Sequence, residues 1–331
     1  MDSEVLSLCQ AYKDYFPIGA AVNSQLIKTH ENLILKHFNS ITLDNDMKFI
    51  ETQPKPGIYT TDVADNIIRF AIDNKMMIRG HTLVWHTQVP DWVFEDENGN
   101  PASRELLLKR MREHISYIVN RYKNKVYCWD VVNEAIDDNK DQFLRETKWI
   151  SLIGEDYIDK AFQFAHEADS NAILFYNDYN EAYPDKRDKI YSMVKGMIER
   201  GVPIHGVGLQ GHANIYEPSV YDIRESIEKF AELGLTLQIT EMDVSVFRYD
   251  DHRKDISKPT TEMLKRQADL YEEMFKIFRE YKEVISGVTL WGLADDHTWL
   301  DDFPVKNRKN WPLLFDEKHL PKLAFDAITH W

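Results

Sequence analysis

Two glutamates stand where apolar segments end, far apart in the sequence. Glu134 follows the run 126–133, and Glu241 follows the run 235–240. Cleavage of a glycosidic bond requires one carboxyl group to protonate the leaving oxygen, while a second attacks the anomeric carbon or activates water. When two carboxyl groups lie close together, one holds its proton towards neutral pH and the other stays anionic. If the fold brings them together, Glu134 and Glu241 can divide this chemistry between them.

Polar neighbours support this interpretation of each glutamate. Asn133 directly precedes Glu134, and its neutral amide can hold a sugar hydroxyl. A chain of Glu241, His212 and Asp243 could fix the ionisation and the aim of a nucleophile. Each glutamate could instead form a salt bridge at the rim of the fold. For His212, the spacing alone favours a structural role over a catalytic one.

Eight short apolar runs alternate with longer amphipathic segments along the chain. The runs cover residues 16–22, 40–43, 77–85, 126–133, 172–176, 204–209, 235–240 and 287–291. The helix-like segments cover residues 61–74, 103–122, 155–168, 185–199, 219–233 and 260–281. This alternation predicts parallel strands with crossover helices, and eight units without a linker favour a single (β/α)8 TIM barrel of the α/β class over residues 1–331. An open doubly wound sheet is the alternative.

A barrel of this kind gathers reactive groups at the carboxyl ends of its strands, in the βα loops. We expect these loops to be extended and to form a substrate cleft. Strands four and seven face one another in a ring of eight, so Glu134 and Glu241 can meet across the barrel. Indole rings beside polar residues suit the C–H faces and hydroxyls of a sugar. Two tryptophans are expected in the cleft, Trp291 and Trp299, and three others are expected to fill packing space, namely Trp129, Trp149 and Trp331.

Several segments resemble those of a known family. Residues 129–135, Trp-Asp-Val-Val-Asn-Glu-Ala, and residues 239–243, Ile-Thr-Glu-Met-Asp, resemble the two active-site segments of glycoside hydrolase family 10, the endo-β-1,4-xylanases. Further segments similar to that family follow in the same order, at 81–86, 208–212, 291–292 and 314–317. The resemblance extends from about Ile18 to Phe325. With the loop at 293–299 and no recognisable signal peptide, the chain looks most like the intracellular bacterial branch.

The resemblance implies a retaining mechanism through a covalent glycosyl-enzyme intermediate. Glu134 would be the acid/base and Glu241 the nucleophile; Asn133 would hold the 2-hydroxyl of the sugar being cleaved, and His212 with Asp243 would support the nucleophile. The sugar-binding residues implied by the family are Asp44, Asn45, Lys48, His81, Trp85, Gln88, Tyr179, Gln210, Trp291 and Trp299. Two departures concern the distal subsite and the tolerance of decorated substrates: family members commonly have Glu where Asp44 stands, and segment 300–310 differs from that of many relatives.

Composition argues against several other classes of protein. With 40 basic and 55 acidic residues, the net charge of −15 would repel nucleic acid and anionic membranes, so we expect neither as a partner. The family resemblance implies a xylo-oligosaccharide as substrate. The only cysteines, Cys9 and Cys128, are too few for a disulfide framework. Residues 206–211 satisfy G-x-G-x-x-G but are not followed immediately by a helix-like segment, so no nucleotide cofactor is expected. Without a motif such as His-Glu-x-x-His, no metal is expected either.

The sequence leaves location, oligomeric state and substrate preference less constrained. Residues 1–4 lack the basic start and apolar stretch of a signal peptide, which predicts a cytoplasmic protein. The sequence does not determine the oligomeric state.

One functional alternative is a catalytically silent barrel that only binds a sugar or a protein, and hydrolysis of chromogenic xylo-oligosaccharides would exclude it. The other is an enzyme of the same mechanism that prefers β-1,4-glucan or mannan, which rates on xylan and cellulose oligomers would distinguish.

Overall fold

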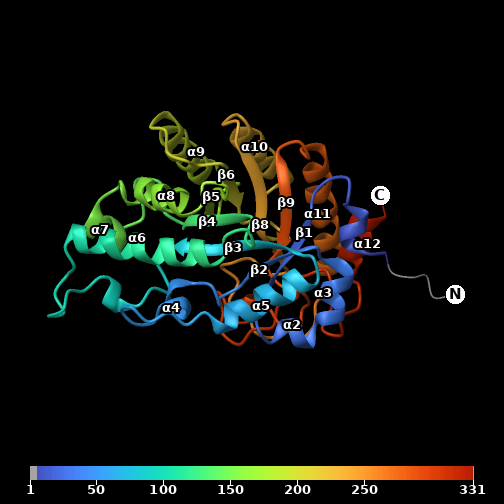
Figure 1. Cartoon of the computed structure of the whole chain (residues 1–331). Coiled ribbons are helices and arrows are strands. Elements are labelled where there is room, and N and C mark those ends of the chain that lie inside the picture. The colour runs from blue at the N-terminus through green and yellow to red at the C-terminus, as the bar shows by residue number, and fades with distance from the viewer. Residues whose placement is uncertain (1–5, 331) are drawn as a thin grey trace.

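The chain forms a closed barrel of parallel strands surrounded by helices (Figure 1). The computed structural model describes residues 6–330. The strands within them are β1 (Ile18–Val22), β2 (Ser40–Leu43), β3 (Met77–Val84), β4 (Cys128–Asn133), β5 (Ile173–Asp178), β6 (Gly206–Leu209), β7 (His212–Asn214), β8 (Thr236–Ser245) and β9 (Ile285–Leu290). β1 to β6 pair in chain order, β6 pairs with β8, β8 with β9, and β9 with β1, all in parallel. The predicted (β/α)8 barrel is confirmed.

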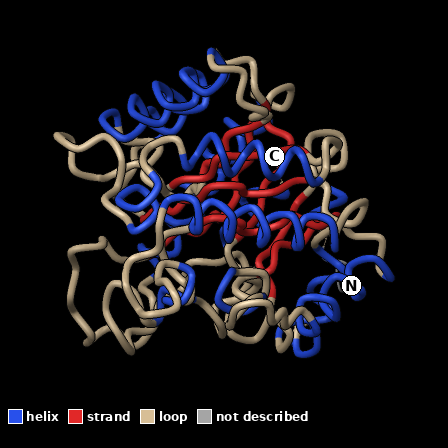
Figure 2. Tube along the Cα trace, turned by 60° about the vertical axis from the view of Figure 1, so that its left-hand side comes forward, coloured by secondary structure: helices blue, strands red, loops and turns tan. Residues whose placement is uncertain are grey.

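Helices cover the outside of the barrel, and Figure 2 shows the red strands enclosed by blue helices. The α-helices are α1 (Leu8–Ala11), α2 (Leu26–Thr29), α3 (Glu31–His37), α4 (Phe49–Thr52), α5 (Asp62–Asp73), α6 (Arg104–Arg121), α7 (Lys148–Ile153), α8 (Tyr157–Ala168), α9 (Pro184–Glu199), α10 (Val220–Ala231), α11 (Thr261–Glu280) and α12 (Leu323–Thr329). α6 illustrates why they form. The hydroxyl of Ser103 caps it by accepting from the Leu106 N–H at 3.2 Å, and Leu107, Met111 and Ile115 recur on its buried face.

The sixth strand of the barrel is interrupted. β6 ends at Leu209, and β7 resumes at His212 after Gly211, whose φ is +74°. A Cβ atom at Gly211 would lie only 2.9 Å from Ile239 Cγ2, so both the backbone conformation and the available space favour glycine. β7 then pairs in parallel with the end of β8, which aligns His212 with Asp243 across the two strands. Gly211, the last glycine of the G-x-G-x-x-G stretch 206–211, therefore allows the break between β6 and β7.

The seventh strand of the barrel is longer than the sequence predicted. We expected a strand over 235–240 with Glu241 and Asp243 beyond it, but β8 continues to Ser245. The apolar residues Met242 and Val244 are fully buried and extend the alternation of the strand. Glu241 and Asp243 therefore lie on the strand itself, which positions them more rigidly than a loop would.

The first and last helices meet beside the start of β1. The Tyr12 hydroxyl, just after α1, donates to the Ile328 carbonyl of α12 at 2.5 Å. The Tyr12 ring also packs on Phe275 of α11, with ring centroids 5.1 Å apart. Among the helices of residues 6–330, none combines the length and the apolar character that a membrane crossing requires.

Several packing predictions can be compared with the structure. Trp129 and Trp149 are each 1% exposed, as expected for residues that fill packing space. Cys128 is also buried, and burial raises the pKa of its thiol to about 12, which makes it inert. Trp331 and residues 1–4, on which two further predictions depend, lie outside the described residues.

Candidate active site

Glu241 lies at the carboxyl end of the barrel and is 5% exposed. Its Oε1 accepts a hydrogen bond from Asn177 Nδ2 at 2.8 Å, and its Oε2 lies 3.4 Å from His212 Nε2. Burial would raise the pKa of Glu241, but the hydrogen bond from His212, the charge of His81 and the Asn177 bond lower it to about 2. Glu241 is therefore an anionic carboxylate at neutral pH.

His212 connects this carboxylate to a second one. Its Nδ1 lies 2.9 Å from Asp243 Oδ1, so Glu241, His212 and Asp243 form a continuous chain of contacts. The second oxygen of Asp243 accepts a hydrogen bond from Trp299 Nε1 at 2.8 Å. Burial alone would lower the pKa of His212, but the two carboxylates raise it to about 10. The imidazolium thus places a fixed positive charge beside Glu241.

Glu134 directly follows β4 and is held through its backbone, at φ +59°. This left-handed conformation is uncommon outside glycine and persists where surrounding contacts determine it. The Glu134 N–H donates to the Asn177 carbonyl at 2.9 Å, and Arg145 Nε donates to the Glu134 carbonyl at 3.2 Å. The next two N–H groups, of Ala135 and Ile136, both donate to the Tyr176 hydroxyl, at 3.0 and 3.2 Å.

The Tyr176 hydroxyl is itself oriented by an acid. It donates its proton to Asp178, and both residues are buried. Burial raises the pKa of Asp178 to about 6, although the nearby charge of Lys186, whose Nζ lies 3.2 Å away, opposes the rise. Because Tyr176 gives its only proton to Asp178, its oxygen is free to accept the two N–H groups that follow Glu134.

Amide side chains connect the two glutamates. Asn177 Nδ2 lies 2.8 Å from both Glu241 Oε1 and Asn133 Oδ1. Gln210 Nε2 lies 3.0 Å from Glu134 Oε1 and 3.5 Å from Asn133 Oδ1. The ends of β4 and β5, the second half of β8 and the residue after β6 thus converge on one site at the mouth of the barrel. The structure brings together the carboxylate pair that the sequence predicted.

A second polar group lies beside Glu134, around Lys48. Its Nζ donates to Asn45 Oδ1 at 3.0 Å and lies 4.8 Å from the ring centroid of Trp85. Gln88 Nε2 donates to the same oxygen of Asn45 at 3.1 Å. Trp85 Nε1 in turn donates to Glu134 Oε2 at 2.8 Å. Lys48, Trp85 and Gln88 also line a small pocket, so these predicted sugar-binding residues are contiguous with the carboxylate pair.

Lys48 carries charge close to both glutamates. Burial lowers its pKa, while the charges of Asp44, Glu241 and Glu134 act in the opposite direction. Asp44 itself is only half-buried, directly after β2. The buried ammonium group therefore lies where sugar hydroxyls could replace its missing hydration.

Two tryptophans line another side of the mouth. Trp291 is 9% exposed and meets the His81 ring edge-on, with centroids 5.2 Å apart. Trp299 is 36% exposed, and its ring stacks on Phe303 with centroids 5.0 Å apart. The Trp299 ring also lies 5.1 Å from that of His212. An exposed indole held between two neighbours offers a rigid face to a pyranose ring.

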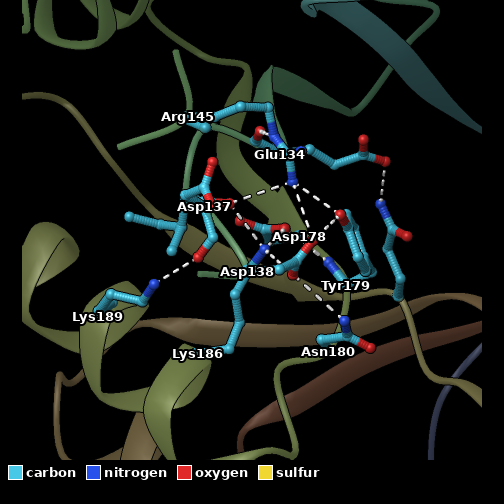
Figure 3. Close-up of polar contacts among 12 residues, drawn as sticks. Glu134, Asp137, Asp138, Arg145, Asp178, Tyr179, Asn180, Lys186 and Lys189 are labelled. Atoms are coloured by element: carbon cyan, nitrogen blue, oxygen red, sulfur yellow. Dashed lines mark hydrogen bonds and ion pairs between the residues drawn. The ribbon is translucent and has the colours of Figure 1, made fainter. Parts of the chain in front are cut away.

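Tyr179 follows β5 and is surrounded by charged residues, as Figure 3 shows. Its hydroxyl donates to Asp138 and accepts from Arg145 Nη2 at 2.7 Å. Lys186 of α9 lies 4.3 Å from the ring centroid and 3.0 Å from Asp138 Oδ1. Burial and the bond to Asp138 raise the pKa of Tyr179. The phenol is thus fixed in place between the loop after β4 and the start of α9.

Asn177 is a site residue to which the sequence gave no role. Thr240 Oγ1 donates to Asn177 Oδ1 at 2.7 Å, which turns the amide nitrogen towards Glu241. Its position among polar residues after the fifth apolar run was visible in the sequence. The partners of the amide were not, because they come from β4 and β8.

A buried ion pair below His81 was also missed. Arg79 pairs with both carboxylate oxygens of Asp130, and the two residues are fully buried inside the barrel. His81 Nδ1 lies 2.8 Å from Asp130 Oδ2, and Gln238 Oε1 accepts from Arg79 Nε at 2.9 Å. The available signal was the presence of charged residues within the apolar runs 77–85 and 126–133. The pair holds the His81 ring in a position where its Nδ1 lies 4.0 Å from Glu241 Oε1.

Comparison with known proteins identifies the family. The sequence model of glycosyl hydrolase family 10 matches residues 7–331, almost the whole chain. The chain belongs to glycosyl hydrolase family 10. The family predicted from the two glutamate segments is therefore confirmed.

Several relatives match this family 10 protein over nearly their full length. An endo-1,4-beta-xylanase of Geobacillus stearothermophilus is 52% identical over 330 residues, which cover 100% of both chains. The crystal structure of xylanase XynB from Paenibacillus barcinonensis, complexed with a conduramine derivative, is 51% identical, has a TM-score of 0.98 and covers 99% of each chain. A mutant protein in complex with xylotriose is 48% identical, with a TM-score of 0.97, and covers 98% of this chain and 100% of that one.

Proposed function

We propose that this protein is a retaining endo-1,4-β-xylanase that hydrolyses xylo-oligosaccharides derived from xylan. The main support is the pair of glutamates at one mouth, connected by Asn177, Asn133 and Gln210. A relative named as an endo-1,4-beta-xylanase at 52% identity and a structural neighbour solved with xylotriose support the choice of substrate.

In the first step, an oxygen of Glu241 attacks the anomeric carbon of the bound sugar. The bond from that carbon to the leaving oxygen breaks, and Glu134 transfers its proton to that oxygen. The product is an ester between Glu241 and the sugar. Glu241 suits this role because the His212 charge and the Asn177 hydrogen bond keep it anionic and aimed.

In the second step, water attacks the same carbon and the ester bond breaks. Glu134, now a carboxylate, accepts a proton from that water, and Glu241 leaves as a carboxylate. Glu134 suits both steps because its side chain is only half-buried while its backbone is held in place. Two inversions at one carbon retain the configuration of the sugar.

The remaining residues divide into three groups in this proposal. Asn133 holds the 2-hydroxyl of the sugar that is cleaved. The residues proposed to bind the other sugars on its non-reducing side are Asp44, Asn45, Lys48, His81, Trp85, Gln88, Gln210, Trp291 and Trp299. Tyr179, fixed by Asp138 and Arg145, offers a stacking face for the leaving-group sugar.

Proton NMR of fresh hydrolysis products tests the proposal. With xylotriose or a longer oligomer as substrate, the first reducing end to appear is expected in the β configuration, before mutarotation. An initial α product would contradict the retaining mechanism, and a crystal structure should place the two carboxyl groups roughly 5–5.5 Å apart. Faster hydrolysis of cellulose oligomers than of xylan would contradict the substrate, and hydrolysis of neither would contradict the activity.

A further inference from the structure

Two histidines and an aspartate from three distant segments meet outside the carboxylate site. His30 Nε2 lies 3.1 Å from Asp296 Oδ1, and His319 Nε2 lies 3.3 Å from Asp296 Oδ2. The two imidazole rings lie side by side, with centroids 4.1 Å apart. One ligating atom of each side chain lies within 4.8 Å of the others. We call these three residues the His30–Asp296–His319 trio.

The donor atoms of the trio suit a borderline transition-metal ion. Two imidazole nitrogens and one carboxylate oxygen, with a water completing the set, are a common arrangement around Zn²⁺. In a tetrahedral zinc site with bonds of about 2.0–2.1 Å, neighbouring ligand atoms lie roughly 3.3 Å apart. Each ring nitrogen lies near that spacing from one oxygen of Asp296: His30 Nε2 is 3.1 Å from Oδ1, and His319 Nε2 is 3.3 Å from Oδ2. A carboxylate that binds the ion through one oxygen would turn to present that oxygen between the two rings.

The surroundings of the trio meet two further requirements of a metal site. His30 is 4% exposed, and its other ring nitrogen lies 2.7 Å from Thr29 Oγ1. Such a second contact orients a ligating imidazole and fixes which nitrogen faces the ion. The side chains of Asp296 and His319 are each 33% exposed, which leaves room for entry of an ion and for a water ligand.

The trio also lies where the barrel closes. His30 stands between α2 and α3 after β1, and Asp296 follows β9, the strand that pairs with β1. His319 belongs to the turn 316–320, in which Asp316 Oδ1 accepts from the N–H groups of residues 318 and 320 at 2.8 and 2.9 Å. An ion bound here would connect the first and last units of the barrel.

We propose that His30, Asp296 and His319 form a binding site for a divalent transition-metal ion, with Zn²⁺ as the preferred probe. The sequence gave the opposite expectation, because it offered no local metal motif and the three ligands are contributed by segments around residues 30, 296 and 319. The ion plays no part in bond cleavage. It stabilises the closure between β1 and β9 and the loop that carries Trp299.

Titration of chelator-treated full-length protein with ZnCl₂ tests the site. Calorimetry is expected to give one equivalent of bound zinc, and saturation at about 100 times Kd should raise the thermal midpoint by roughly 3–6 °C. Co²⁺ in place of zinc should show the visible absorption of a four-coordinate site. The absence of stoichiometric binding by the wild-type protein would overturn the proposal.

Two variants and two controls locate the bound ion. His319→Gln and Asp296→Asn remove partly exposed ligands and are expected to weaken zinc binding by at least about tenfold and to abolish the thermal shift. His252→Gln, an exposed histidine in the loop before α11, should bind zinc like the wild-type protein. Glu241→Gln should also bind normally. Unchanged binding by both ligand variants, or loss of binding in Glu241→Gln, would place the ion elsewhere and refute the assignment.

Discussion

The two sides of the mouth hold their glutamates by different means. Glu241 is held through its side chain, because Asn177 and His212 contact its two oxygens and the group is 5% exposed. The two oxygens of Glu134 accept hydrogen bonds from neutral donors, Trp85 Nε1 and Gln210 Nε2. Its backbone is held as well, because its own N–H and the next two N–H groups all have partners. The side chain of Glu134 remains half-buried.

This contrast matches the two chemical demands of the proposed retaining mechanism. A nucleophile must stay ionised and aimed, so fixed charges around the carboxylate are useful to it. An acid/base must change its protonation twice in each cycle, so its position has to be fixed without fixing its charge. Neutral donors to the Glu134 side chain and an anchored backbone meet the second demand. Surrounding the carboxylate of Glu241 with cations and amides meets the first.

Of the variants that test this contrast, Glu241→Gln is expected to lower the activity most. The amide cannot form the ester, so kcat should fall by roughly 10⁴–10⁶-fold on every substrate. Aryl xylobiosides with good and poor leaving groups provide the measurement, and circular dichroism should show an intact fold. A loss that disappears with good leaving groups would contradict the role of Glu241.

Glu134→Gln should produce a selective loss. Without the proton donor, hydrolysis of substrates with poor leaving groups should slow by about 10²–10⁴-fold. Aryl xylobiosides whose leaving groups need no protonation should still form the glycosyl-enzyme rapidly, giving a burst of released phenol. Equal losses across leaving groups would mean that the two sides of the mouth do not differ in the way described.

His212→Asn removes the fixed charge beside Glu241 and should also alter the pH dependence of stability. The variant leaves two buried carboxylates without their cation, which costs about 3–5 kcal/mol of unfolding free energy at pH 6. The pKa of His212 is raised from 6.5 to about 10, so its contribution is fully present below pH 6.5 and is lost as the pH rises towards 10. Urea unfolding should therefore show a difference between wild type and variant that shrinks over this range. A constant difference would contradict the assigned charge.

Tyr176→Phe tests the backbone anchor of Glu134 and should have the smallest effect. It leaves the N–H groups of Ala135 and Ile136 without their acceptor, which costs about 1–3 kcal/mol. The activity loss should be greater for poor leaving groups than for good ones. Tyr157→Phe is the matched control, since that phenol is also buried nearby and makes no hydrogen bond within residues 6–330. Equal effects of the two variants would contradict the role of the Tyr176 hydroxyl in anchoring the backbone next to Glu134.

The fold was accessible from the sequence because strand and helix periods are local. Strand boundaries agreed closely for β2 and β4, where polar residues stand just outside the apolar runs. The length of β8 was underestimated, because Glu241 and Asp243 interrupt the apolar run although Met242 and Val244 maintain the alternation. The break at Gly211 looked like part of a nucleotide motif. Its left-handed backbone and the lack of room for a Cβ atom beside Ile239 explain the glycine instead.

The site was only partly accessible for a related reason. The glutamates and their sequence neighbours could be found, since each lies next to a strong strand signal. Asn177 acts through a partner on β8, and Tyr176 through partners in the loop after β4. No spacing within one segment reveals such contacts. The His30–Asp296–His319 trio is an extreme case, because its three members are brought together only when the barrel closes.

Contact between α1 and α12 also makes the chain suitable for circular permutation. Tyr12 and Ile328 touch beside the start of β1, whereas the glutamates lie where the strands finish. A short peptide could join these helices, and new termini could be made in the exposed turn 123–125 between α6 and β4. Both the joining peptide and the new termini would then lie on the face of the barrel opposite the substrate. Fusion partners could be attached to these termini without obstructing a long polysaccharide.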